Sequence, residues 1–359
     1  MPARADRRGG AFAILTRSQD CPRQLPFQAV PQTSTPLSIL DLAAVGREET
    51  VAESFAGSLE LARLAERCGY RRIWYAEHHN ISSIASSATA VLIAHIAAHT
   101  ETIRLGAGGV MLPNHSPLVI AEQFGTLETL HPGRIDLGLG RAPGTDQRTW
   151  MALRRDPRAS DRFPQDVVEL QKFLGDESPL PGIKAIPGRG THIPLYILGS
   201  SLFGAELAAE LGLPYAFASH FAPRFLHEAI GAYRERFKPS RQQPEPYVIA
   251  GVGVIAAETS ESAAAQLEAA RRVRARALFG RGRKLSEEDV TALLESPQAA
   301  AVDEMLAYTA VGVADEVTTY LNGFAADTGA DELMTVHYSD SVPNRLRSVE
   351  LTAPQRTPT

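Results

Sequence analysis

Short apolar runs alternate with longer amphipathic stretches along the chain from about residue 36 onward. Each run is rich in Ile, Leu and Val and is followed by polar or Gly-rich residues. The stretch at 51–68 repeats its apolar side chains at steps of three and four and closes with Cys68-Gly69, as amphipathic helices do. The alternation therefore predicts strands at the apolar runs and helices between them.

Eight strands are expected from this pattern. They cover residues 37–42, 72–79, 102–112, 134–144, 194–201, 214–221, 246–257 and 332–339. Alternating strands and helices imply a parallel sheet, because the chain must cross back over the sheet after each strand. Eight such units favour an α/β fold of the (β/α)8 TIM-barrel type.

Two connections are longer than a single helix requires. Residues 145–193 contain a helical pattern at 164–174, and residues 258–331 contain an Ala- and Arg-rich helical pattern at 260–279. Both are interpreted as insertions in the barrel, after strands 4 and 7. A doubly wound open sheet is the alternative, but no G-x-G-x-x-G opens a helix near the N-terminus.

The two ends of the chain differ in composition from its middle. Residues 1–35 are rich in Arg, Gln and Pro and show no periodicity, so they are expected to form a disordered N-terminal extension. Residues 36–350 are expected to form one barrel domain, and residues 351–359 a flexible tail.

Composition and charge narrow the classes of function. The chain has 359 residues, of which 44% are hydrophobic, and a net charge of −5. No run of 18 or more apolar residues and no basic field are present, so neither a membrane span nor nucleic-acid binding is expected. The 2 cysteines cannot form a disulfide framework or a Cys/His zinc motif, and a reducing cytoplasm is expected.

Polar and small residues collect where the predicted strands end. The residues that follow the eight strands in order are Asp41; Glu77, His78 and His79; Gly106 to Gly109; Gly138 to Arg141; Gly199, Ser200 and Ser201; Ser219 and His220; Gly251 and Gly253; and His337 and Tyr338. The opposite strand ends show ordinary turn chemistry. Because barrel enzymes place their active sites at the C-terminal ends of the strands, this asymmetry predicts an enzyme.

Gly199-Ser200-Ser201 stands immediately before a predicted helix. Free N–H groups at a helix N-terminus bind phosphate, and serine hydroxyls add donors. A plain serine N-cap explains the same residues. Arg141 either neutralises that phosphate or pairs with a surface carboxylate. Glycines at strand ends are either turn residues or places where a flat ligand approaches the backbone.

The adjacent His78 and His79 cannot both face the barrel interior, because successive strand residues point to opposite sides. A metal site made from both is therefore not expected, although one of them together with His220 and His337 could bind a metal. A histidine at the barrel mouth can also transfer a proton near pH 7, and a structural role is the simplest interpretation of any single histidine.

Four segments resemble the bacterial luciferase-like, FMN-dependent monooxygenases, and specifically the luciferase family oxidoreductases of group 1. The segments are WYAEHHN, IRLGAGGVMLPNHSPLVIAEQFGTLETLHPGRIDLGLGRAPG, PLYILGSS and ASHFAP, and the resemblance covers residues 36 to 350. It implies a (β/α)8 barrel and a monooxygenase that acts on paired donors with incorporation of oxygen into a small organic substrate. It also implies reduced FMN from a separate NAD(P)H reductase, and a homodimer.

The resemblance assigns roles to residues at matching positions. His78 matches a proton-transfer group beside the flavin, and Gly108-Gly109 matches a pair whose non-prolyl cis peptide lies against the isoalloxazine ring. Arg141, Ser200, Ser201 and Gly204 match the binding site of the FMN phosphate, with Gly199 beside them. Gly140 stands where luciferase itself has a reactive cysteine, so light emission is not expected. Asp41, Glu77, His220 and His337 are expected on the substrate side, and no metal is expected.

Three other functions stay open at this point. One is a deazaflavin-dependent hydride transfer in the same barrel, and another is a flavin-binding protein without catalysis. The third is a metal-dependent barrel hydrolase. The first strand, LSILDL, lacks the H-x-H pair that such hydrolases use.

Overall fold

The computed structural model describes residues 33, 35–46, 48–142, 146–156, 158–280 and 283–354. Every helix and strand belongs to the compact unit formed by residues 31–359. The predicted N-terminal extension falls almost wholly outside the described residues, as do the last 5 residues of the predicted tail.

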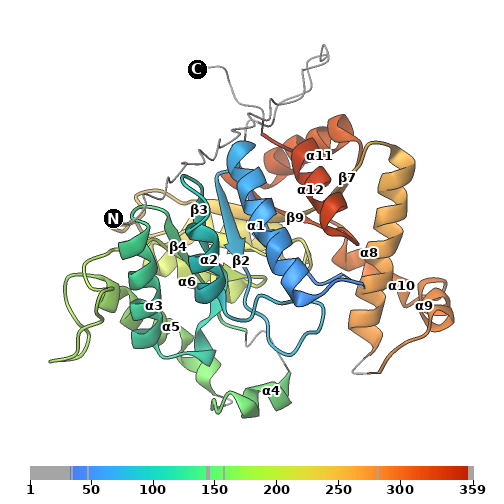
Figure 1. The fold of residues 1–359 in the computed structure, drawn as a ribbon. Helices are drawn as coiled ribbons and strands as arrows, with labels where there is room; N and C mark the ends of the chain where they lie inside the picture. The colour runs from blue at the N-terminus through green and yellow to red at the C-terminus, as the bar shows by residue number, and fades with distance from the viewer. Residues whose placement is uncertain are drawn as a thin grey trace, which may run out of the picture. The chain divides into compact units, whose positions relative to one another are not determined.

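The strands of this unit all pair in parallel, and eight of them close into a barrel (Figure 1). The strands are β1 (Leu37–Asp41), β2 (Arg72–Tyr75), β3 (Arg104–Met111), β4 (Ile135–Gly140), β5 (Leu195–Gly199), β6 (Tyr215–Phe217), β7 (Val248–Ala256), β8 (Thr309–Gly312) and β9 (Glu332–His337). The barrel follows the order β1 to β7 and then β9, which pairs with β1. The predicted fold class is confirmed.

Helices lie outside the strands, as Figure 1 shows for α1, α2 and α3. The helices are α1 (Val51–Arg67), α2 (Thr89–Ala97), α3 (Pro117–Leu130), α4 (Gln147–Ala152), α5 (Phe163–Leu174), α6 (Leu202–Leu211), α7 (Leu226–Arg236), α8 (Ser260–Gly280), α9 (Glu287–Leu294), α10 (Ala299–Met305), α11 (Ala314–Thr328) and α12 (Val342–Leu351). Both predicted insertions carry helices of their own: α4 and α5 precede β5, and α8, α9 and α10 precede β8.

One strand was not predicted. β8 lies inside the second insertion and pairs its residues 309–312 with residues 253–256 of β7. β7 has 9 residues and pairs with β9 along residues 249–254, whereas β6 pairs only with its residues 248–250. The end of β7 beyond β6 is therefore free to take a third neighbour. The strand expected as the eighth is therefore β9, and β8 lies outside the closed barrel.

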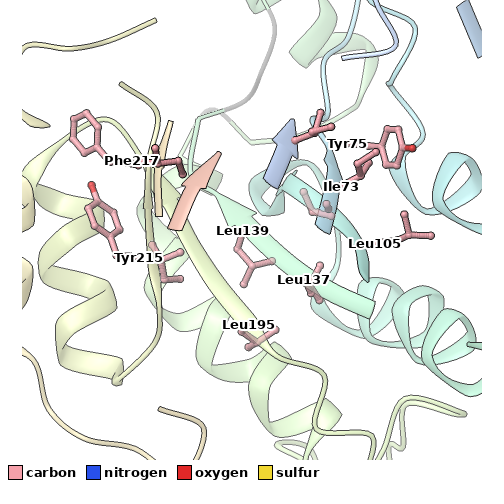
Figure 2. Packing of buried hydrophobic residues seen from close by; sticks show 14 of the residues in the cluster. Ile73, Tyr75, Leu105, Leu137, Leu139, Leu195, Tyr215 and Phe217 are labelled. Carbon is pink, nitrogen blue, oxygen red and sulfur yellow. The ribbon is translucent and has the colours of Figure 1, made fainter. Parts of the chain in front are cut away.

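Side chains of the barrel strands alternate between two layers, as the pleat of a strand requires. One set packs against the helices; Figure 2 shows part of it, with Ile73, Leu105 and Leu137 labelled. The other set fills the barrel, where Trp74 packs with the apolar side chains of Leu40, Tyr196, Ile249, Met334 and Val336. The filled interior leaves only the two ends of the barrel for polar chemistry.

The N-terminal end of the barrel holds a buried ion network rather than the turn chemistry that the sequence indicated. Arg72 donates to Asp136 (2.6 Å), to the Tyr196 hydroxyl (2.7 Å) and to Glu332 (3.2 Å). Arg104 adds a second guanidinium to Asp136. Arg71 lies 3.7 Å from Glu332, so three guanidinium groups face two carboxylates whose own side chains are buried.

Candidate active site

Two histidines from opposite parts of the barrel meet at its C-terminal end, here called the mouth. His78 follows β2 and His220 follows β6, and the two rings lie close enough for His78 to contribute to the low pKa of His220. Among the described residues, neither Nδ1 atom has a hydrogen-bond partner, although both are buried. Burial lowers the pKa of His78, and lowers that of His220 to about 3, so both rings are neutral at pH 7.

Two glycines of β7 make room for the side chains that cross this strand. A Cβ on Gly251 would lie 2.5 Å from His220 Nδ1, and a Cβ on Gly253 would lie 2.6 Å from the Tyr338 ring. Tyr338, which follows β9, donates its hydroxyl proton to the His220 carbonyl at 2.7 Å. The structure places His220 at this end of the barrel, and its role on the substrate side stays a prediction.

A further cation at the mouth was not found from the sequence. The Arg274 guanidinium lies 4.9 Å from the centre of the Tyr338 ring, and its charge contributes to the low pKa of His220. Arg274 belongs to α8, in the second insertion. No motif distinguishes it from the other arginines of that helix, and only the packing of α8 reveals its direction.

Buried glycines of β3 and β4 form a stretch of backbone without side chains close to His78, since the N–H of the preceding Glu77 donates to the Gly109 carbonyl. The peptide between Gly108 and Gly109 is cis, as the resemblance implied. A Cβ on Gly108 would lie 2.7 Å from the Trp74 side chain, and a Cβ on Gly138 would lie 2.3 Å from the Ala107 carbonyl oxygen. Gly140 is less constrained, because only the flexible Met111 side chain lies near its Cβ position.

Glu77 holds the loop that follows β3. Its buried carboxylate accepts hydrogen bonds from the Met111 backbone (3.0 Å), from Asn114 (3.2 Å), and from the rings of His79 (2.8 Å) and His115 (2.9 Å). Burial by itself would raise the pKa of Glu77, but these hydrogen bonds lower it to about 2. Both oxygens are therefore engaged by the chain itself, which favours a positioning role for Glu77 over direct substrate contact.

The N-terminus of α6 offers unpaired donors. Ser201 is the N-cap residue in an extended conformation, and its side chain makes no capping hydrogen bond. The first turn of α6 contains no acidic residue. Arg141 lies over the ring of Phe203 in this turn, 4.1 Å from its centre, and pairs with no carboxylate that the structure describes. Gly199 and Gly204 approach each other there: a Cβ on Gly199 would lie 3.8 Å from the Gly204 Cα.

Two predicted substrate-side residues face the helices instead of the mouth. Both ring nitrogens of His337 are engaged, Nδ1 with Ser348 of α12 at 2.8 Å and Nε2 with Thr335 at 3.1 Å. Asp41 accepts from the Ala43 backbone at 2.9 Å and lies 3.7 Å from Arg345 of α12. Their placement on the substrate side is corrected accordingly, because the pleat turns the last residue of β1 and of β9 outward.

The described residues form neither a membrane-spanning helix nor a metal-binding cluster. None of the helices within these ranges is both long enough and apolar enough to cross a membrane. No set of three or more His, Cys, Asp or Glu side chains is grouped so that it could hold a metal ion, again within the described ranges.

More distant proteins share the barrel or part of the sequence. The N-acetyl-S-alkylcysteine monooxygenase of Bacillus subtilis is 39% identical over 234 residues, 63% of this chain and 69% of its own. The oxygenating constituent of 3,6-diketocamphane monooxygenase from Pseudomonas putida, in complex with FMN, is 18% identical with a TM-score of 0.67, covering 89% and 97% of the two chains. An F420-dependent secondary alcohol dehydrogenase is 16% identical with a TM-score of 0.64, covering 88% and 97%. The last two show the fold alone.

Nearer relatives cover almost the whole chain. The protein YvbT of Bacillus subtilis is 48% identical over 89% of this chain and 96% of its own, and a luciferase-like monooxygenase of Escherichia coli is 47% identical over 88% and 95%. The crystal structure of apo-MsnO8 superposes with a TM-score of 0.79 at 39% identity, covering 89% and 96% of the two chains. Residues 35–332 match the family described as luciferase-like monooxygenase. The chain therefore belongs to the luciferase-like monooxygenase family.

Proposed function

We propose that the protein is an FMN-dependent monooxygenase that uses reduced flavin and dioxygen to oxygenate a small organic substrate. The observation that carries this proposal is the N-terminus of α6. Its backbone N–H groups have no intrahelical partner, and neither a capping side chain nor an acidic residue satisfies them. A phosphate fits there, because the helix dipole, the Ser200 and Ser201 hydroxyls and Arg141 all favour negative charge.

The surface beside His78 suits the ring of a flavin. Gly108, Gly109 and Gly138 present backbone without side chains, and a Cβ on any of the three would lie too close to neighbouring atoms for a larger residue to fit. Trp74 and Leu40 close the barrel directly beneath Gly108 and exclude water from below. Reduced FMN in this position would supply the electrons for the activation of dioxygen.

His78 is the residue that we assign to proton transfer. Its ring is neutral at pH 7, and its Nδ1 is buried without a partner, so that atom can accept a proton or hold one beside the reacting groups. Replacement of His78 by Asn removes the titratable nitrogen. We expect a loss of product formation of about 100-fold or more, with FMN affinity retained within a factor of about two.

The names of the relatives agree with oxygen chemistry. The Escherichia coli relative at 47% identity and the Bacillus subtilis relative at 39% identity are both named monooxygenases, whereas the F420-dependent protein resembles this chain only in fold. The N-acetyl-S-alkylcysteine monooxygenase supports a small substrate, and thioethers of that class belong in the first substrate screen. We propose that reduced FMN comes from a separate reductase in the cytoplasm.

The test is a calorimetric titration of the wild type and of Ser200→Asp/Ser201→Asp with oxidised and reduced FMN. The added carboxylates should weaken FMN binding about 100-fold or more, because they place negative charge where the phosphate binds. Riboflavin, which lacks the phosphate, should bind the two proteins much more similarly.

Ser286→Asp serves as the matched control. Ser286 is the N-cap of α9, and its hydroxyl already accepts from the Asp289 backbone, a task that aspartate also performs. This variant should bind FMN as the wild type does. Binding of coenzyme F420 without binding of FMN would instead support the deazaflavin function. Equal FMN affinity in all three proteins would contradict the proposed phosphate site at α6.

A homodimer is also proposed. Helices α2 and α3 carry exposed apolar side chains, with Val91 71% and Leu130 63% accessible. Sedimentation velocity on the wild type and on Val91→Asp tests whether this surface holds two copies together; a wild type that sediments as a monomer would contradict it.

A further inference from the structure

The arginines of α8 fall into two groups. Arg271, Arg272 and Arg276 each pair with carboxylates of the same insertion, namely Glu268, Asp303 and Glu287. Arg274 pairs with no carboxylate in the part of the chain that the structure describes, and turns toward Tyr338 at the mouth instead. In Figure 1, α8 stands with α9 and α10 as one group, and the paired arginines account for part of that packing.

Arg274 is held beside the candidate active site by its neighbours. It lies over the face of the Tyr338 ring, and the Tyr338 hydroxyl is fixed by its hydrogen bond to the His220 carbonyl. The aromatic face stabilises the guanidinium group without neutralising its charge. The side chain is only partly exposed, so its orientation is fixed by packing more than by solvent.

Two carboxylates at the C-terminal ends of the strands are not available to this arginine. Glu77 is surrounded by donors from Met111 and His115, and Asp41 faces Arg345 on the other side of the barrel wall. The imidazoles of His78 and His220 are neutral. The described part of this barrel end therefore carries two guanidinium groups without a carboxylate beside them, Arg141 at the start of α6 and Arg274 over Tyr338. A planar guanidinium binds carboxylates through paired N–H donors.

We propose that Arg274 binds a carboxylate group of the substrate, so that the enzyme acts on small organic acids rather than on neutral aldehydes or hydrocarbons. The proposal rests on the proposed function, because it places the reacting part of the substrate near His78. His220 lies close enough to both Arg274 and His78 for each to contribute to its low pKa, and its buried ring can add a hydrogen bond to the bound acid.

Calorimetry with hexanoate and hexanamide tests the proposal, since these probes have nearly the same size and differ in charge. On the wild type loaded with FMN, hexanoate should bind at least about tenfold more tightly than hexanamide, as expected for a charge-assisted hydrogen-bonded pair. Arg274→Gln should abolish the difference, and Arg274→Lys should retain part of it. No preference in the wild type, or a preference that survives in Arg274→Gln, would overturn the proposal.

Arg276→Gln is the matched control on the same helix, because Arg276 is already paired with Glu287. The Arg276→Gln variant should keep the preference for hexanoate. Loss of the preference in this variant would show a general effect of charge on α8 and would overturn the specific role of Arg274. The same titrations on protein without flavin separate this proposal from the proposed function. If FMN fails to bind while the preference persists and depends on Arg274, only the proposed function fails.

Titration of Arg274→Gln with FMN and riboflavin tests whether Arg274 binds the flavin phosphate instead of the substrate carboxylate. Unchanged affinity for both flavins leaves Arg274 to the substrate and supports the proposal. A selective loss of FMN affinity would assign Arg274 to the flavin phosphate and overturn the proposal.

Discussion

Histidines at the C-terminal ends of the strands differ in whether their ring nitrogens are already hydrogen-bonded within the chain. His78 and His337 both follow or end a barrel strand, and both are largely buried. His78 keeps a free Nδ1, whereas His337 uses both nitrogens within the chain. The first arrangement favours chemistry and the second favours stability, although the sequence presents the two residues in similar positions.

His337 makes the protein sensitive to acid. Burial, with a smaller contribution from Arg345, lowers its pKa to about 3, while the unfolded chain titrates near 6.5. A lowered pKa means that the unfolded state takes up the proton first, so this stabilisation is complete above pH 6.5 and falls as the pH drops toward 3. Between pH 6.5 and 5 the loss is about 2 kcal/mol for this one residue.

Replacement of His337 by Gln isolates this effect. At pH 7.5 the variant should be about 1–2 kcal/mol less stable than the wild type, because the hydrogen bonds to Ser348 and Thr335 are weakened. Lowering the pH to 5 should destabilise the wild type by about 2 kcal/mol relative to the variant, so the gap should close or change sign, since the unfolded variant has one proton fewer to take up. Urea denaturation at pH 7.5, 6.5 and 5 measures it; parallel stability curves would contradict the assignment.

At the scale of elements, β3 and β4 approach so closely that their glycines admit no larger residue. A Cβ on Gly138 would lie 2.3 Å from the backbone oxygen of Ala107 and 2.5 Å from Leu198. Backbone cannot move aside as a flexible side chain can, so Gly138→Ala should cost about 2 kcal/mol or more. We expect a lower melting temperature and weaker FMN binding in this variant.

Gly323→Ala is the control for that prediction. Gly323 lies inside α11, and a Cβ there would meet no atom within 4 Å. Alanine at an open helical position should stabilise the protein by up to about 1 kcal/mol. Calorimetric melting of both variants should therefore shift in opposite directions. A destabilised Gly323→Ala would show that α11 does not tolerate the methyl group.

The sequence predicted the helices and strands better than it predicted the directions of individual side chains. The eight barrel strands and the two insertions could be predicted because the spacing of apolar residues and the turn residues are local signals. β8 could not, since its 4 residues lie among helical patterns and pair only with the long end of β7. The outward turn of Asp41 and His337, and the inward turn of Arg274, depend on packing between segments far apart in the chain.

The whole barrel is held at its N-terminal end by the network around Arg72. Arg72 comes from β2, Asp136 from β4, Tyr196 from β5 and Glu332 from β9, so one guanidinium joins four of the eight barrel strands. Ser38 of β1 and Tyr247, next to β7, also donate to Glu332. Removal of the Arg72 guanidinium would leave each buried carboxylate with a single, partly exposed arginine, Arg104 beside Asp136 and Arg71 beside Glu332. Such a loss is costlier than that of a surface pair.

Arg72→Met should therefore destabilise the protein by about 3–5 kcal/mol at pH 7. Arg63→Met, which removes an exposed pair with Glu60, should change stability by less than about 1 kcal/mol. Urea denaturation of both variants at pH 7 decides the matter. An Arg72→Met protein that is as stable as Arg63→Met would mean that the apolar packing around Trp74 closes the barrel without help from the ion network.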